Sequence, residues 1–132
     1  MLSSCAAAPA GVRIQDAWVR PTPPGTDEAS IYLVVSNGLA ADVFVTGGAA
    51  APCMLVSVHL TETGADGVST MGDADGRVTR VPAGGQLRFE PLGLHLMCHG
   101  LAAPLVEGDH FALTVEFQGA DPRTVDVVVT DR

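Results

Sequence analysis

The chain has 132 residues, a length that suits one domain with a hydrophobic core of ordinary size. Its hydrophobic fraction of 47% is normal for a globular protein. The formal net charge is -8, from 7 Lys and Arg against 15 Asp and Glu. This balance argues against nucleic acid and anionic membrane surfaces as partners, because both bind basic patches.

The N-terminal residues 1–11 are mostly small and are expected to form a flexible segment. Leu2-Ser3-Ser4-Cys5 resembles the end of a bacterial lipoprotein signal, although the apolar region of a complete signal peptide is not present in this sequence. This pattern makes Cys5 a candidate lipid anchor.

Short β-branched runs separated by Gly, Pro and Asp fill residues 12–132, with no helical periodicity and no internal repeat. Many short strands of this kind predict a single all-β domain, a sandwich or barrel. Nine prolines and 15 glycines suit the many turns of such a fold. The expected strands are residues 12–20, 30–36, 42–46, 54–60, 77–81, 86–90, 94–98, 111–117 and 124–130.

Alternation along two of these strands places histidine and methionine opposite the core. In residues 56–60 the even positions are apolar and are expected to face the core, so His59 points the other way. In residues 94–99 the leucines share one face, while His95 and Met97 share the other. Side chains at i and i+2 of a strand are roughly 6 to 7 Å apart and can reach a common ion.

Met71 lies in a Gly- and Asp-rich stretch where a core residue is less expected. With His59, His95 and Met97 it makes a set of two imidazoles and two thioethers. Thioether sulfur is a poor ligand for hard ions, so this uncharged set suits copper(I) best among the common metals. Such a site holds and releases an ion, which is carrier chemistry and not catalysis.

Three cysteines are an odd number, so at least one lies outside any intramolecular disulfide. If Cys5 carries a lipid, Cys53 and Cys98 remain as a possible pair, and the sequence leaves open whether they meet. No CxxC motif is present, which argues against thioredoxin-like and thiolate zinc sites.

Several ordered segments together resemble the bacterial periplasmic copper chaperone A family, from about residue 12 onward. These segments are Ala17-Trp18-Val19-Arg20-Pro21, Ala29-Ser30-Ile31-Tyr32, His59, Gly67-Val68-Ser69-Thr70-Met71, Val81-Pro82-Ala83-Gly84-Gly85, Gly93-Leu94-His95-Leu96-Met97-Cys98-His99-Gly100-Leu101 and Pro104-Leu105-Val106-Glu107-Gly108-Asp109. The resemblance implies a cupredoxin-like Greek-key β-sandwich or barrel outside the cytoplasm. It also implies delivery of copper to the copper A centre of cytochrome c oxidase or to another copper chaperone.

By matching motifs, the resemblance implies that His59, Met71, His95 and Met97 bind copper(I). The family often has a second methionine at the position of His99, which shares the parity of His95. His99 is therefore either an auxiliary ligand or an exposed histidine at a strand end. We expect a monomer with an exposed copper site near one rim of the fold.

Two other functions compete with a copper carrier. An electron-transfer cupredoxin needs a Cys thiolate beside two His and an axial Met, but the parity of Cys98 turns it away from His95 and Met97. An Ig-like interaction module would make the same histidines incidental surface residues. No Ser-His-Asp pattern or G-x-S-x-G motif is visible, so we do not expect an enzyme.

Overall fold

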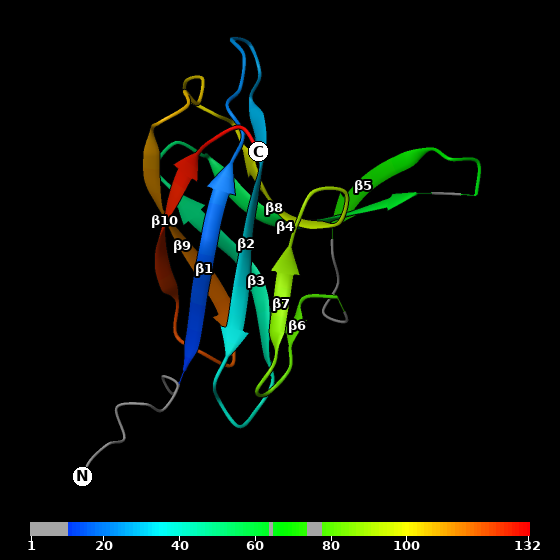
Figure 1. Ribbon diagram of the computed structural model, residues 1–132, viewed down its shortest axis with the longest axis vertical. Coiled ribbons are helices and arrows are strands. Elements are labelled where there is room, and N and C mark those ends of the chain that lie inside the picture. Colours follow the sequence, from blue (N-terminus) through cyan, green and yellow to red (C-terminus); the bar gives the residue numbers. More distant parts are fainter. Residues whose placement is uncertain (1–10, 64, 74–77) are drawn as a thin grey trace.

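The computed structural model describes residues 11–63, 65–73 and 78–132, and for residues 62, 63 and 69–73 it describes the backbone alone. The described part contains ten β-strands joined in one hydrogen-bonded sheet (Figure 1). The strands are β1 (Val12–Val19), β2 (Glu28–Asn37), β3 (Val43–Ala50), β4 (Leu55–Thr63), β5 (Ser69–Asp73), β6 (Arg80–Val81), β7 (Gln86–Phe89), β8 (Leu94–His99), β9 (His110–Gln118) and β10 (Arg123–Val129).

Seven of these strands close into a barrel in the order β4, β8, β2, β1, β10, β9 and β3. The barrel closes where Gly48 of β3 pairs with Val56 of β4. A Cβ atom at Gly48 would lie 2.7 Å from the Thr114 carbonyl oxygen, so glycine lets β3 approach β9 closely at this point. The sheet is mixed because β1 runs parallel to β10, while the other barrel pairs are antiparallel.

The predicted all-β class and single domain are confirmed by this closed barrel. Each of the nine expected strands is found, with most ends shifted by a few residues and the strand expected over 77–81 shortened to β6. Residue 77 lies outside the described residues, as does segment 1–11 apart from Gly11. One strand was missed: β5, whose Gly and Asp residues are typical of a turn.

The core fills the barrel with the alternate apolar side chains of its strands. Ile31, Leu33 and Val35 of β2 face Leu96 and Cys98 of β8 in one buried cluster. Val56 and Val58 of β4 and the even positions of β8 belong to this cluster, and Leu60 packs against it, so the predicted core face of both strands is correct. The odd positions of these two strands therefore lie on the outside of the barrel.

Beyond its pairing with β8, β4 continues into a hairpin with β5, which extends sideways from the barrel (Figure 1). The registers of the two pairings are continuous, since His59 pairs with His95 on one side and with Asp73 on the other. The base of this hairpin and the centre of β8 thus meet at one place on the outer face.

Candidate metal centre

β8 lies between β4 and β2, and its register sets the positions of the candidate ligands. His59 of β4 lies directly opposite His95, and Ser57 lies directly opposite Met97. On the other side, Met97 pairs with Ser30 of β2. Directly opposite residues on neighbouring strands share a face of the sheet. Three of the four predicted ligands are therefore neighbours on one face of the barrel wall.

The two opposite imidazoles have a separation that suits a shared ion. The ring centroids of His59 and His95 are 6.0 Å apart, and the rings are tilted by 56°. A histidine nitrogen about 2 Å from a metal places its ring centroid roughly 3 Å away, so two rings on one ion have centroids about 5 to 6 Å apart. The spacing of these rings fits that range without a change in backbone register.

His95 presents a nitrogen suited to a metal. Its side chain is buried, at 2% exposure. The Nδ1 atom lies 3.0 Å from the carbonyl oxygen of Gly93, and because a carbonyl only accepts, Nδ1 carries the proton. The lone pair is then on Nε2, which has no hydrogen-bond partner within the part of the chain that the structure describes. A buried imidazole nitrogen oriented in this way is typical of a metal ligand.

The electrostatics of His95 keep it neutral. Burial lowers the pKa of the His95 imidazole below its ordinary value, and the neighbouring His59 adds to this effect. The hydrogen bond to Gly93 opposes it only in part. Only the neutral form of imidazole has a lone pair to donate to a metal.

The structure describes the side chain of Met97 but only the backbone of Met71. Met97 is buried, at 4% exposure, beside a hollow that residues 26–30 also line. The backbone of β5 places Met71 opposite Thr61, two residues beyond His59 on β4. The side chain of Met71 lies outside the described residues. Its role as a ligand stays a prediction.

The expectation of an exposed site was wrong for two of the candidate ligands. His95 and Met97 point away from the core, as their parity indicates, yet both are buried, and only His59 is half-buried. On the outer face of β8, neighbouring strands flank both candidate ligands, and the segment 26–30 lies beside Met97. His59 is therefore the more accessible of the two imidazoles.

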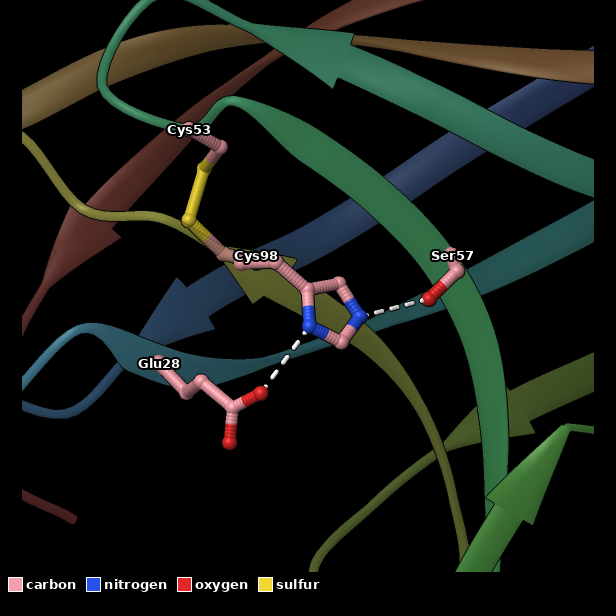
Figure 2. The surroundings of a disulfide bond; sticks show 5 residues. Glu28, Cys53, Ser57 and Cys98 are labelled. Atoms are coloured by element: carbon pink, nitrogen blue, oxygen red, sulfur yellow. Dashed lines mark hydrogen bonds and ion pairs between the residues drawn. A yellow bond between two sulfur atoms is a disulfide. The ribbon is translucent and has the colours of Figure 1, made fainter.

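His99 belongs to a hydrogen-bonded group that the sequence did not reveal. Its Nε2 lies 2.8 Å from Ser57 Oγ, and its Nδ1 lies 2.9 Å from Glu28 Oε2. Dashed lines in Figure 2 mark these two contacts, which end on the labelled Ser57 and Glu28. The order Ser-His-carboxylate is that of a serine hydrolase. Hydrolase serines on a nucleophile elbow occupy a sharp, exposed turn, whereas Ser57 is half-buried within β4.

Cys53 and Cys98 form a disulfide, which settles the pairing that the sequence left open (Figure 2). Cys98 is fully buried on the core face of β8, as its parity predicts. In this form it offers no thiolate to a metal, so the electron-transfer alternative loses its ligand. Cys5 lies outside the described residues.

Two kinds of feature are absent from the described part of the chain. No group of three or more His, Cys, Asp or Glu side chains converges there in a way that could hold a metal ion. Among the same residues, no helix is long and apolar enough to cross a membrane.

The closed seven-stranded barrel defines a domain with the PCuAC fold. It superposes on the copper-bound PCuAC domain from PmoF2 with a TM-score of 0.73 and 21% identity, covering 96% of this chain and 97% of that one. Against CuI-DR1885 from Deinococcus radiodurans the TM-score is 0.71 with 23% identity, covering 96% of this chain and 83% of that one.

Residues 12–129 match the family described as "Putative lipoprotein LpqE-like", and the chain belongs to this family. A protein of Leifsonia xyli subsp. xyli, described as "Putative lipoprotein Lxx21020", is 32% identical over 121 residues, which are 92% of this chain and 70% of that protein. Together with the fold, these matches confirm the resemblance that the sequence motifs indicated.

The lowered pKa of His95 predicts how the stability of the metal-free protein depends on pH. The unfolded chain gains a proton on His95 near pH 6.5, whereas the folded protein gains it only at lower pH. The free energy of unfolding should therefore fall as the pH drops below about 6.5, until the folded pKa is passed. Urea unfolding between pH 7.5 and pH 5 measures this slope, which should be smaller in His95→Asn.

Two carboxylates also make the free energy of unfolding depend on pH, but at more acid pH than His95, so the two effects can be measured separately. A hydrogen bond from Arg132 lowers the pKa of Asp16, and a backbone hydrogen bond from Ala83 lowers that of Asp42. Their stabilisation is complete above about pH 4 and is lost only below it. An equal slope above pH 5 in the wild type and in His95→Asn would contradict the prediction for His95.

Proposed function

We propose that this protein binds one copper(I) ion through His59, His95, Met97 and Met71 and passes it to an acceptor protein. The observation that carries the proposal is the buried Nε2 of His95, which has no hydrogen-bond partner among the described residues. It lies in a strand beside Met97 and opposite the ring of His59. Leaving a buried polar atom without a partner is costly unless a ligand occupies it.

The chemistry of these groups favours copper(I). The ion has a filled d shell and accepts two to four ligands without a strict geometry, and thioether sulfur suits it better than it suits copper(II) or zinc. The site needs no thiolate, so an oxidising environment does not disable it. Two proteins with this fold are described as copper-bound and as CuI-loaded, which supports the same cargo here.

The arrangement of the ligands suggests a route for transfer. His59 is the more exposed imidazole and lies at the base of the β4–β5 hairpin. An acceptor ligand that replaces His59 first would share the ion with His95 and Met97 before removing it. Exchange of this kind avoids release of the free ion. We propose the copper A centre of cytochrome c oxidase, or another copper chaperone, as the acceptor of a monomeric donor.

The location we propose is outside the cytoplasm. The Cys53–Cys98 disulfide is typical of an oxidising compartment, and the family carries the description "Putative lipoprotein LpqE-like", which supports the same location. Cys5 is the residue we assign to a lipid anchor, which mass spectrometry of the N-terminal peptide would detect. The function we propose is that of a carrier and not of an enzyme.

Titration of the metal-free protein with copper(I) in the presence of bicinchoninate tests binding. We expect one ion per chain and a complex that resists the competing chelator. Mixing the loaded protein with an apo copper A domain then tests transfer, with NMR spectra of both partners as the readout. A protein that removes no copper(I) from the chelator would disprove the proposed function. Binding without transfer would disprove this acceptor alone.

A further inference from the structure

We propose that Leu92 is the apolar contact through which the copper-accepting domain docks beside the metal site. The inference rests on the proposed function and adds the kind of surface that the acceptor presents, which is an apolar pocket next to its own copper ligands. In this assignment Leu92 lies outside the ligand set and binds no metal.

Leu92 occupies the turn between β7 and β8 in a backbone conformation that leucine rarely adopts. Its φ is 68°, in the left-handed region. The N–H of Gly93 donates to the carbonyl of Glu90 at 3.1 Å and closes a four-residue turn with Pro91 and Leu92 at its centre. Proline second and a left-handed residue third are the pattern of a type II turn, whose third residue is usually glycine or asparagine. A leucine at this position strains the backbone.

The side chain of Leu92 does not offset this strain by packing. It is 86% exposed, and it belongs neither to the buried core nor to the apolar residues packed against the core. Among the described residues, the only other non-glycine with a positive φ is Asp16, whose carboxylate pairs with Arg132. A strained backbone that carries an exposed apolar side chain lowers stability. Contacts within this chain do not account for it, so we look for the reason in a partner.

The turn is attached to the candidate metal centre through the residue that follows Leu92. The carbonyl of Gly93 accepts from Nδ1 of His95 at 3.0 Å and from the N–H of Thr61 at 3.2 Å. Thr61 lies two residues beyond His59 on β4, where β4 also pairs with β5. In Figure 1 the yellow-green loop between β7 and β8 lies beside the base of this hairpin. Three residues of chain span at most about 11 Å, so the Cα atoms of Leu92 and His95 lie within that distance.

Direct exchange of the ion brings the acceptor over this turn. In the proposed route an acceptor ligand replaces His59 while His95 still holds the ion, so the acceptor surface around that ligand covers the residues next to both histidines. A typical interface covers roughly 800 Å² on each partner, a patch that extends about 15 Å from its centre. Leu92 therefore falls inside the contact area.

An exposed leucine in this place provides affinity for the acceptor without using a metal ligand. Burying a leucine side chain in an apolar pocket is enough to change a binding equilibrium by tenfold or more. The hydrogen-bonded turn holds the side chain in place, so little conformational entropy is lost on docking. An anionic membrane is a poorer match, because the chain has a net charge of -8.

Leu92→Asn and Leu92→Gly test the contact in the copper(I)-loaded protein, with an apo copper A domain as the acceptor and NMR as the readout of transfer. Both residues adopt a positive φ readily, so the turn is kept. We expect transfer at low acceptor concentration to slow by tenfold or more, and copper(I) affinity against bicinchoninate to stay within about twofold. Leu92→Met keeps an apolar side chain and should transfer within about threefold of the wild-type rate.

Two controls separate docking from a structural role. Val128→Thr changes another exposed apolar side chain, on β10, which β2 and β1 separate from β8, and it should alter neither transfer nor affinity. Urea unfolding of the metal-free variants gives the second control. Leu92→Asn and Leu92→Gly relieve backbone strain, so their unfolding midpoints should equal or exceed that of the wild type. A lower midpoint in both would assign Leu92 a structural role and overturn the inference.

Other results would also overturn it. One is transfer from Leu92→Asn and Leu92→Gly less than threefold slower than from the wild type. Another is a loaded wild type that transfers no copper(I) to the copper A domain, because that domain is the occupant named here. A dimer of the loaded protein in light scattering, or binding to phosphatidylglycerol vesicles, that Leu92→Asn abolishes would make a second copy or a membrane the occupant instead. Failure of the wild type to take copper(I) from bicinchoninate would disprove the proposed function itself.

Discussion

Replacing His95 with Asn is expected to lower copper(I) affinity by at least about 100-fold. Removing a group that only orients a metal ligand costs up to about this much, and removing the ligand itself should cost no less. Asn offers a donor near the position of Nδ1 and so can keep the contact to Gly93. It has no group at the position of Nε2, which is the atom assigned to the ion. Competition with bicinchoninate measures the change.

The controls separate a lost ligand from a damaged fold. Met97→Leu keeps nearly the same volume in a buried position, so a change in stability under about 1.5 kcal/mol is expected together with a clear loss of affinity. His110→Asn removes an exposed imidazole on β9, outside the β4–β8 pair, and should leave copper(I) affinity unchanged. An affinity in His95→Asn within threefold of the wild type would remove His95 from the site.

The sequence predicted the two faces of the site strands because alternation is a local property. Val56 and Val58 of β4 and Leu94, Leu96 and Cys98 of β8 all face the core, as their parity indicates. The same rule put the candidate histidine and methionine residues on the opposite face. This much needs no knowledge of which strands are neighbours.

The surroundings of the site could not be predicted in this way, because they depend on pairing between distant strands. His99 lies 42 residues from Ser57 and 71 residues from Glu28. Its parity marked it as a neighbour of His95 and Met97, but no local pattern indicated its two partners. The burial of His95 and Met97 was missed for the same reason, since neighbouring strands flank both and the segment 26–30 lies beside Met97.

β5 was missed because its local composition contradicts its structure. Gly72 and Asp73 are poor strand residues, and the segment pairs only because β4 extends beyond the barrel to meet it. Here the backbone pairing with β4 outweighs the low intrinsic preference of these residues for a β-strand. The consequence for the proposed site is direct, since this pairing brings the backbone position of Met71 close to that of His59.

Removal of the Cys53–Cys98 disulfide should lower the free energy of unfolding by about 4 kcal/mol. The bond spans 45 residues, and releasing a loop of that length restores roughly this much conformational entropy to the unfolded chain. Cys53→Ala/Cys98→Ala, measured by urea unfolding in a Cys5→Ala background, checks the value. Removing Cys5 prevents disulfide exchange with a third thiol.

The disulfide also links the segment before β4 to β8, the strand that carries His95 and Met97. Cys98 lies between Met97 and His99, and Cys53 lies two residues before the start of β4. Reduction of the disulfide in the Cys5→Ala protein should lower the free energy of unfolding by the same amount as the double variant. Reduction leaves both side chains in place, so the comparison separates the loss of the crosslink from the effect of a cavity in the core. A loss below about 1 kcal/mol in both would show that β-sheet pairing alone holds these strands together. A loss in the variant alone would assign the effect to core packing at Cys98.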